Sequence, residues 1–158
     1  MSSINPYAKF LDGRPLEVIL ASTPSALTGL IKVIGPEKST TPPAPGKWSA
    51  AQIACHLADC EIAFGFRLRQ TLAEDNHVVQ PFDQEKWAQT YDGVAAAQAL
   101  ATFAALRNWN LQLINAALPT SADRRLSHPE RGEMTFKTIV ETMAGHDLNH
   151  LTQLRKLL

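Results

Sequence analysis

Apolar residues recur at the spacing of an α-helix in four stretches of the chain. In the first, from Pro15 to Ile34, leucines and isoleucines fall on one side of a helix, but Ser22-Thr23-Pro24 interrupts them. Proline is favoured in the first turn of a helix after a Ser or Thr cap, so we expect a short helix before this point and a longer one from about Pro24. Gly35 to Gly46 holds four prolines, and we expect neither helix nor strand there.

The second stretch carries a strong signal for the start of a helix. Ser49 is followed three residues later by Gln52, which is the spacing of a capping box. A helix is therefore predicted from Ala50 to about Glu74. Its apolar stripe consists of Ile53, Leu57, Cys60, Phe64 and Leu68. His56 and Asp59 lie on the flank of this stripe, at the edge of the predicted buried face.

Long polar connections lie on either side of the third stretch. Asp75 to Gly93 is long for a bare loop, so we expect a short helix around Asp83 to Gln89 that acts as a lid or wall. Val94 to Leu118 is rich in alanine and is predicted to be a helix that Pro119 ends. The inward side of this helix is expected to hold Leu100, Phe103, Leu106, Trp109 or Asn110, Leu113 or Ile114, and Ala117. Thr120 to Met134 is a second polar connection.

The last helix is expected to begin after a cap at Thr135 and to continue to the C-terminus. Its apolar stripe includes Ile139, Met143, Leu154 and Leu157. His146 and His150 interrupt this stripe, and because they are four residues apart their rings lie on one face of the helix. We find no alternating strand pattern and no internal repeat. The prediction is one all-α domain over residues 1–158, a four-helix bundle with extended connections.

Composition narrows the class of protein. The chain is 45% hydrophobic and 19% charged, as in soluble globular proteins, and its 15 basic and 15 acidic residues cancel, which argues against a nucleic-acid partner. The first ten residues lack the pattern of a signal peptide and no window is apolar enough to span a bilayer, so we expect a cytoplasmic protein without a membrane partner. Cys55 and Cys60 face different directions on a helix, which disfavours a disulfide.

The two histidines of the last helix form half of a possible metal site, and His56 is the best candidate for a third ligand. His146 and His150 occupy predicted core positions, where unpaired polar groups are costly, so metal binding is favoured over a chance spacing. Three neutral imidazoles leave the ion an open position. There the ion would lower the pKa of bound water to about 7 or deprotonate a thiol.

Two residues near His56 leave alternatives open. Asp59 could orient a histidine, accept a proton as a catalytic group or occupy a coordination position, and it could equally be a solvated helix carboxylate. Cys60 could complete a closed structural site or could serve only in packing.

Other polar residues near these helices have less to suggest a role at the ion. Asp147 points about 100° away from its neighbour His146, which disfavours direct ligation. Gln153 either lines the pocket or faces solvent. His77 and His128 fall in the polar connections and are expected at the surface rather than at a metal.

Four groups of residues follow one another along roughly Pro24 to Leu158. They are Lys47-Trp48-Ser49, His56-Leu57-Ala58-Asp59, His128-Pro129 with Gly132, and His146-Asp147 with His150 and Gln153. In this order the chain resembles the DinB-like superfamily, including its YfiT-like metal-dependent hydrolases. The resemblance implies an antiparallel four-helix bundle, often a homodimer, whose divalent metal is held by three histidines. The matching positions are His56, His146 and His150.

The resemblance also bears on the reaction. Relatives include S-transferases that use bacillithiol or mycothiol and isomerases that use such thiols, whereas others have no assigned activity. We therefore expect a metal-dependent hydrolase or a thiol S-transferase with a small-molecule substrate, and for the transferase a low-molecular-weight thiol. Zn and Ni are the first candidates for the ion, followed by Fe and Mn. The alternatives are a non-catalytic metal-stabilised module or small-ligand binder, and a metal-free interaction protein whose histidines pair with buried carboxylates.

Overall fold

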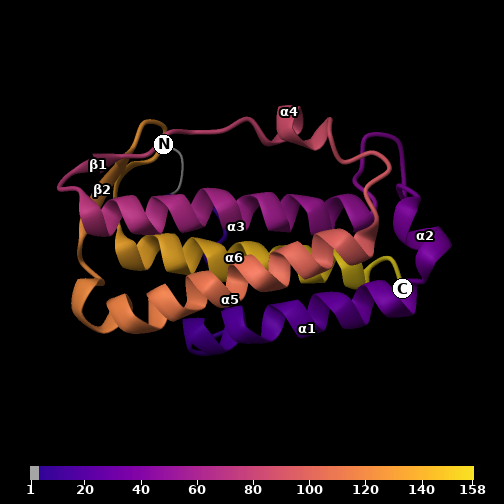
Figure 1. Cartoon of the computed structure of the whole chain (residues 1–158), viewed down its shortest axis with the longest axis horizontal. Coiled ribbons are helices and arrows are strands. Elements are labelled where there is room, and N and C mark those ends of the chain that lie inside the picture. The colour runs from indigo at the N-terminus through magenta and orange to yellow at the C-terminus, as the bar shows by residue number, and fades with distance from the viewer. Residues whose placement is uncertain (1–3) are drawn as a thin grey trace.

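Four long helices lie side by side in the computed structural model, which describes residues 4–158 (Figure 1). They are α1 (Leu16–Ile34), α3 (Ala50–Ala73), α5 (Ala96–Ser121) and α6 (Phe136–Arg155). Both α1 and α3 pack against α5 and α6, so the four surround one core. The predicted four-helix bundle is confirmed. The shorter elements are a 3₁₀ helix at Ala8–Phe10, α2 (Pro36–Thr40), β1 (His77–Val78), α4 (Gln84–Ala88), β2 (Arg125–His128) and β3 (Gly132–Thr135).

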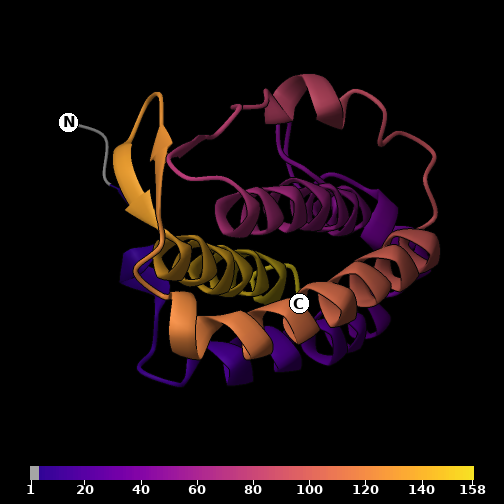
Figure 2. The ribbon, with the colours of Figure 1, turned by 60° about the vertical axis from the view of Figure 1, so that its left-hand side comes forward.

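The directions of the helices follow from their connections. In Figure 1, α1 and α6 run one way along the bundle, and α3 and α5 run the other way. The pairs α1–α3 and α5–α6 are thus antiparallel, as expected. The long connection between α3 and α5 carries α4 and returns the chain to the opposite end, which leaves these two neighbours parallel. This connection passes outside α3, on the side away from α1 (Figure 2), and α4 lies within the range predicted for a short helix.

The helices that carry the three histidines begin where the sequence predicts. Ser49 and Gln52 form the expected capping box, with Gln52 N donating to Ser49 Oγ at 3.2 Å and Ser49 N donating to Gln52 Oε1 at 2.9 Å. Thr135 caps α6 by accepting a hydrogen bond from Thr138 N at 3.2 Å. These caps fix the first residue of α3 and of α6.

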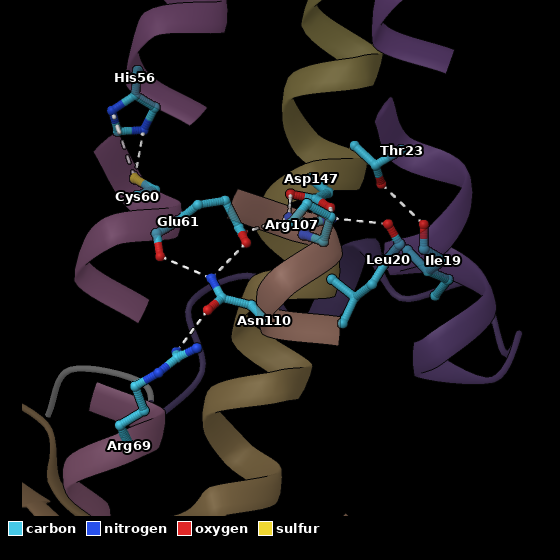
Figure 3. Close-up of polar contacts among 10 residues, drawn as sticks. All are labelled: Ile19, Leu20, Thr23, His56, Cys60, Glu61, Arg69, Arg107, Asn110 and Asp147. Carbon is cyan, nitrogen blue, oxygen red and sulfur yellow. Dashed lines mark hydrogen bonds and ion pairs between the residues drawn. The ribbon is translucent and has the colours of Figure 1, made fainter. Parts of the chain in front are cut away.

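The predicted break in the first helix is wrong, because α1 continues through Pro24. Proline has no N–H to donate to the carbonyl of Leu20, four residues earlier. Arg107 Nη1 donates to that carbonyl instead, at 3.0 Å (Figure 3). In the same turn Thr23 Oγ1 donates to Ile19 O at 3.0 Å. The helix continues through Pro24 because Arg107 supplies the hydrogen bond to Leu20 O that proline cannot make.

Two further predictions that rested on proline are wrong, one for the proline-rich segment and one for the end of α5. α2 begins with Pro36 at its first position, where a missing N–H removes no hydrogen bond, so the proline-rich segment is not entirely loop. α5 runs three residues beyond its predicted end, with Pro119 inside its last turn. Pro119 lies on the exposed side of α5, where water can bond the carbonyl that it leaves free.

By length and composition, α1 is the one helix within residues 4–158 that could cross a membrane. The expectation that no stretch is apolar enough is therefore wrong. Ile19, Leu20 and Leu27 of this helix are buried in the bundle core, and a core helix passes the same test. The helix packs against α5 and α6, and 33% of its apolar window is buried.

A small three-stranded sheet lies at one end of the bundle, although no strand was predicted. Figure 1 labels β1 and β2 at this end, and Figure 2 shows the β2–β3 hairpin. β1 pairs with β2 in parallel and β2 pairs with β3 antiparallel, with His77 opposite Leu126 and His128 opposite Gly132. Strands of two to four residues are too short to show an alternating pattern in the sequence. The sheet buries His77 and His128, with 9% and 6% of each exposed, so their predicted surface positions are wrong.

A buried ionic network connects all four long helices (Figure 3). Arg107 of α5 donates to Asp147 of α6 at 2.6 Å and 3.1 Å, and to Glu61 of α3 at 2.7 Å. Asn110 donates to the second oxygen of Glu61 at 2.9 Å, and the bond from Arg107 to Leu20 O reaches α1. Burial alone would lower the pKa of Arg107, but the two carboxylates raise it above its ordinary value. The guanidinium therefore stays charged inside the bundle.

This network changes the predicted inward face of α5. Asn110 and Ile114 are the buried members of their pairs, whereas Trp109 is 61% exposed. Arg107, which was not expected inside, is buried in place of its neighbour Leu106, which is only partly buried. A charged residue at an inward position breaks the apolar pattern from which the face was predicted.

Candidate metal centre

The three candidate histidines meet in the core between α3 and α6. His56 Nε2 lies 3.0 Å from His146 Nε2, which in turn lies 3.1 Å from His150 Nε2. All three side chains are buried, and their ligand atoms lie within 4.8 Å of one another. The structure therefore brings together a cluster that could hold a metal ion, although 90 residues separate His56 from His146 along the chain.

The donor atoms of this cluster fit a cation better than they fit one another. His150 Nδ1–H donates to Gln153 Oε1 at 3.0 Å, which leaves the His150 Nε2 lone pair facing the cluster. His146 Nε2 faces both other Nε2 atoms, and a single ring nitrogen with one proton or one lone pair makes only one good hydrogen bond there. Around a tetrahedral zinc ion, two imidazole nitrogens would lie about 3.3 Å apart. The observed separations are close to that value.

Burial keeps the three imidazoles neutral. It lowers the pKa of His56 to about 3, with the nearby His150 as a second cause. The pKa of His146 falls well below its ordinary value, and that of His150 is also lowered, with burial again the largest cause in both. Neutral imidazole is the form that ligates metals, so the ring nitrogens can serve as metal ligands at neutral pH.

A fourth protein ligand is not gathered among residues 4–158. Cys60 Sγ lies 3.5 Å from His56 Nε2, yet it is outside the group whose atoms all lie within 4.8 Å of one another. Burial, followed by the nearby Glu61 and Asp59, raises the pKa of the Cys60 thiol. Within residues 4–158 the clustered donor atoms are therefore those of three histidines, without the fourth protein ligand that closes a structural zinc site.

Asp59, the predicted catalytic group, is hydrogen-bonded to Tyr91 of the connection between α3 and α5. Its Oδ2 accepts a hydrogen bond from Tyr91 Oη at 2.8 Å, and it is not a member of the histidine cluster. Asp147 faces Arg107, in agreement with its expected absence from the ligand set. Gln153 lines a pocket at the histidines and is also exposed, so both of its alternatives apply.

Aromatic rings flank the histidines on two sides. The ring of Trp48 lies 4.7 Å from that of His56, and Tyr7 meets His146 edge to face at 5.0 Å. Tyr7 reaches this position because residue 145 is glycine. A Cβ at Gly145 would lie 2.5 Å from Tyr7 O, so any larger residue there would displace the N-terminal segment. These rings limit the access of water to the faces of the imidazoles.

Two cavities meet at the histidine cluster. The larger has a volume of about 660 Å³ and is lined by Trp48, His150 and Gln153 among others. The smaller has a volume of about 360 Å³ and is lined by His146 and residues of the sheet end of the bundle. His56, Tyr7 and Gln84 line both cavities. A ligand in either cavity would therefore lie beside two of the three histidines.

The sequence model described as the DinB superfamily matches residues 19–154. This chain belongs to the DinB superfamily. Proteins similar to this DinB-superfamily chain include a "Putative metal-dependent hydrolase" of Oceanobacillus iheyensis, 28% identical over 135 residues, which are 85% of this chain and 78% of that protein. A protein of Bacillus cereus with the same name is 26% identical over 165 residues, covering 97% and 95% of the two chains.

A solved structure shares the fold. YfiT from Bacillus subtilis, described as a probable metal-dependent hydrolase with an unusual four-helix bundle topology, superposes with a TM-score of 0.83. The match covers 90% of this chain and 83% of YfiT at 21% identity, which shows that the two helical bundles share their fold.

Several residues of this DinB-superfamily site were not found in the sequence. Arg67 lies 11 residues after His56, about three helical turns, and so on the same face of α3; that spacing could have revealed it. Tyr7 gave no such signal, because it belongs to a short segment without periodicity that packs on α6 only in the folded chain. Trp48 stood out only as part of the Lys47-Trp48-Ser49 motif, and in the fold its ring packs on that of His56.

Proposed function

We propose that this DinB-superfamily chain is a metal-dependent enzyme in which His56, His146 and His150 hold a divalent cation. The carrying observation is that three buried, neutral Nε2 atoms converge beside two cavities without a fourth described ligand. The donor set suits Zn or Ni first, with Fe or Mn as further candidates. When bound, such an ion lowers the pKa of water to about 7 or deprotonates a thiol.

The protein's own residues orient the donors and bind the substrate. The hydrogen bond from His150 to Gln153 selects the tautomer that presents Nε2 to the ion. Trp48 and Tyr7 cover the rings of His56 and His146, so substrate would reach the histidines through the two cavities. The proposed substrates are small molecules.

Hydrolysis is the first candidate reaction. It is supported by the names of the relatives, and it requires one substrate and a water molecule at the open position. A thiol S-transferase is the second candidate, and one observation favours it: two separate cavities meet at the histidines, as a reaction between a low-molecular-weight thiol and a second substrate would need.

The non-catalytic alternatives have less support. A closed structural site would need a fourth ligand, and Cys60 lies outside the cluster. A metal-free interaction protein would need carboxylates paired with the histidines, whereas the buried Glu61 and Asp147 pair with Arg107. We further propose a cytoplasmic homodimer without nucleic-acid or membrane partners; light scattering and fractionation of cells would test this.

Metal analysis of protein purified without an affinity tag tests the proposed function. We expect about one ion per chain, because the cluster offers one set of three donors. His56→Gln and the double variant His146→Gln/His150→Gln should lose the ion. His77→Gln is the matched control, because it removes a buried histidine outside the cluster and should keep the ion.

The loaded protein should then be assayed with esters and amides, and separately with thiols plus electrophiles. Asp59→Asn should keep both the ion and the activity, since Asp59 contacts Tyr91 rather than the cluster. A hundredfold loss in this variant would assign Asp59 to proton transfer. The proposal fails if the wild-type chain binds no ion and the histidine variants leave metal affinity unchanged.

A further inference from the structure

The smaller cavity contains two arginines besides the histidines. Arg67 comes from α3 and Arg131 from the turn between β2 and β3, and both line the cavity that reaches His56 and His146. Side chains of helical residues point back toward the helix N-terminus, so Arg67 extends from its position in α3 toward His56. The sheet end of the bundle thus places positive charge beside the candidate metal centre.

Neither arginine has a carboxylate partner in the part of the chain that the structure describes. Among the described residues, Arg67 donates to the backbone carbonyl Gln80 O at 3.2 Å, and its guanidinium lies over the ring of Phe82 at 5.6 Å. Glu130 also lines the cavity but makes no ion pair with either arginine.

Both arginines line one cavity, so their positive charges act on each other. Burial, followed by the charge of Arg131, lowers the pKa of Arg67. The neighbouring His128 has its pKa lowered by burial and then by Arg131 and Arg67, so it stays neutral rather than adding charge. Partly buried like charges without a counterion are unfavourable, and the binding of an anion between them would remove the repulsion.

We propose that Arg67 and Arg131 form an anion-binding subsite that holds a carboxylate or phosphate group of the substrate while the reacting group lies at the histidine cluster. This inference rests on the proposed function for its second anchor, the metal ion. It narrows the substrate class to small molecules that carry a negative group at a distance from the reacting atom. Arginine suits this task because its planar fork donates two parallel hydrogen bonds to either anion.

A series of ω-mercaptocarboxylates, from 3-mercaptopropionate to 6-mercaptohexanoate, tests the subsite on Co²⁺-loaded protein. Each acid is compared with the amide of the same length, and binding is followed by the change in the absorption of the ion. The thiolate would occupy the metal, and the carboxylate would reach the arginines at the best-matched length. We expect that acid to bind about ten- to a hundredfold more tightly than its amide, the range for charged hydrogen bonds.

Variants assign this preference to the two arginines. The preference should be lost in Arg67→Gln/Arg131→Gln and reduced in Arg131→Lys, which keeps the charge but not the fork. Lys156→Gln is the matched control, because Lys156 lines the larger cavity, and it should keep the preference. Circular dichroism would verify that each variant is folded. Equal binding of acids and amides at all lengths, or a preference that survives in the double arginine variant, overturns the carboxylate form of the proposal.

Inorganic phosphate added to metal-free protein supplies the second arm, followed by calorimetry. Binding that the double arginine variant loses supports the subsite, and with equal binding of acids and amides it identifies phosphate as the group. If the protein binds no metal but binds phosphate in this way, the proposed function fails and the subsite stands. If neither phosphate nor any carboxylate depends on the arginines, the subsite is overturned even where the metal binds.

Discussion

At the residue scale, the neutrality of the buried histidines links the metal centre to pH. His56 has an ordinary pKa of 6.5 in the unfolded chain and about 3 in the folded protein. Between these values the unfolded chain binds a proton that the folded protein does not bind. The free energy of unfolding therefore decreases as the pH falls below about 6.5, and the loss is complete only near pH 3.

We expect the metal-free protein to lose stability on acidification from about pH 7.5 to about pH 5. His56 alone should contribute about 2 kcal/mol of this loss, since its unfolded pKa lies roughly 1.5 units above the lower pH. Urea denaturation at the two pH values, with chelator present, measures the change. His56→Gln should show a loss smaller by about that amount. An equal loss in both proteins would mean that His56 is protonated in the folded state.

Residue-level prediction succeeded where spacing carried the signal. His146 and His150 share a helix face because of their four-residue separation, and His56 lies on the flank of a capped amphipathic helix. The hydrogen-bond partner of Asp59 could not be inferred in this way. Its partner Tyr91 lies 32 residues further along the chain, in a connection whose path the sequence does not define.

At the scale of elements, helix starts were predictable because caps are local. Ser49 and Thr135 each bond to a residue three positions later, so a few residues decide where α3 and α6 begin. The continuity of α1 was not predictable, because the donor to Leu20 O comes from Arg107, 87 residues away. Prediction failed where a tertiary contact overrides a local rule.

Removal of the same arginine alone should destabilise the bundle strongly. Arg107→Met leaves Glu61 and Asp147 buried without a counterion, and the loss of one partner of a buried ion pair costs about 3–5 kcal/mol. Denaturant titration of the metal-free protein would measure this destabilisation.

A triple variant serves as the control for that prediction. Arg107→Met/Glu61→Gln/Asp147→Asn removes all three charges together, so it should recover part of the lost stability. If the single and triple variants are equally unstable, the loss arises from changed packing rather than from the unpaired carboxylates.

At the scale of the whole molecule, the bundle followed from four amphipathic stretches, but the arrangement of its connections did not. The strands of the sheet end contain two to four residues, and they pair across 49 residues between His77 and Leu126. Neither feature leaves a periodic pattern. The sheet nevertheless buries His128 and positions Arg131, so one wall of the smaller cavity was hidden from sequence reasoning.

The histidines come from α3 and α6, which meet only in the folded bundle, so an ion bound by all three should stabilise the whole protein. Zn²⁺ at about 100 times its dissociation constant should add about 2.7 kcal/mol of stability. For a chain of this size that corresponds to a rise in Tm of about 5–10 °C. Scanning calorimetry of metal-free and loaded protein measures the shift, and chelator should reverse it. The double variant His146→Gln/His150→Gln should show no rise, whereas His77→Gln should keep it. A rise of the same size in the double variant would place the ion elsewhere in the protein.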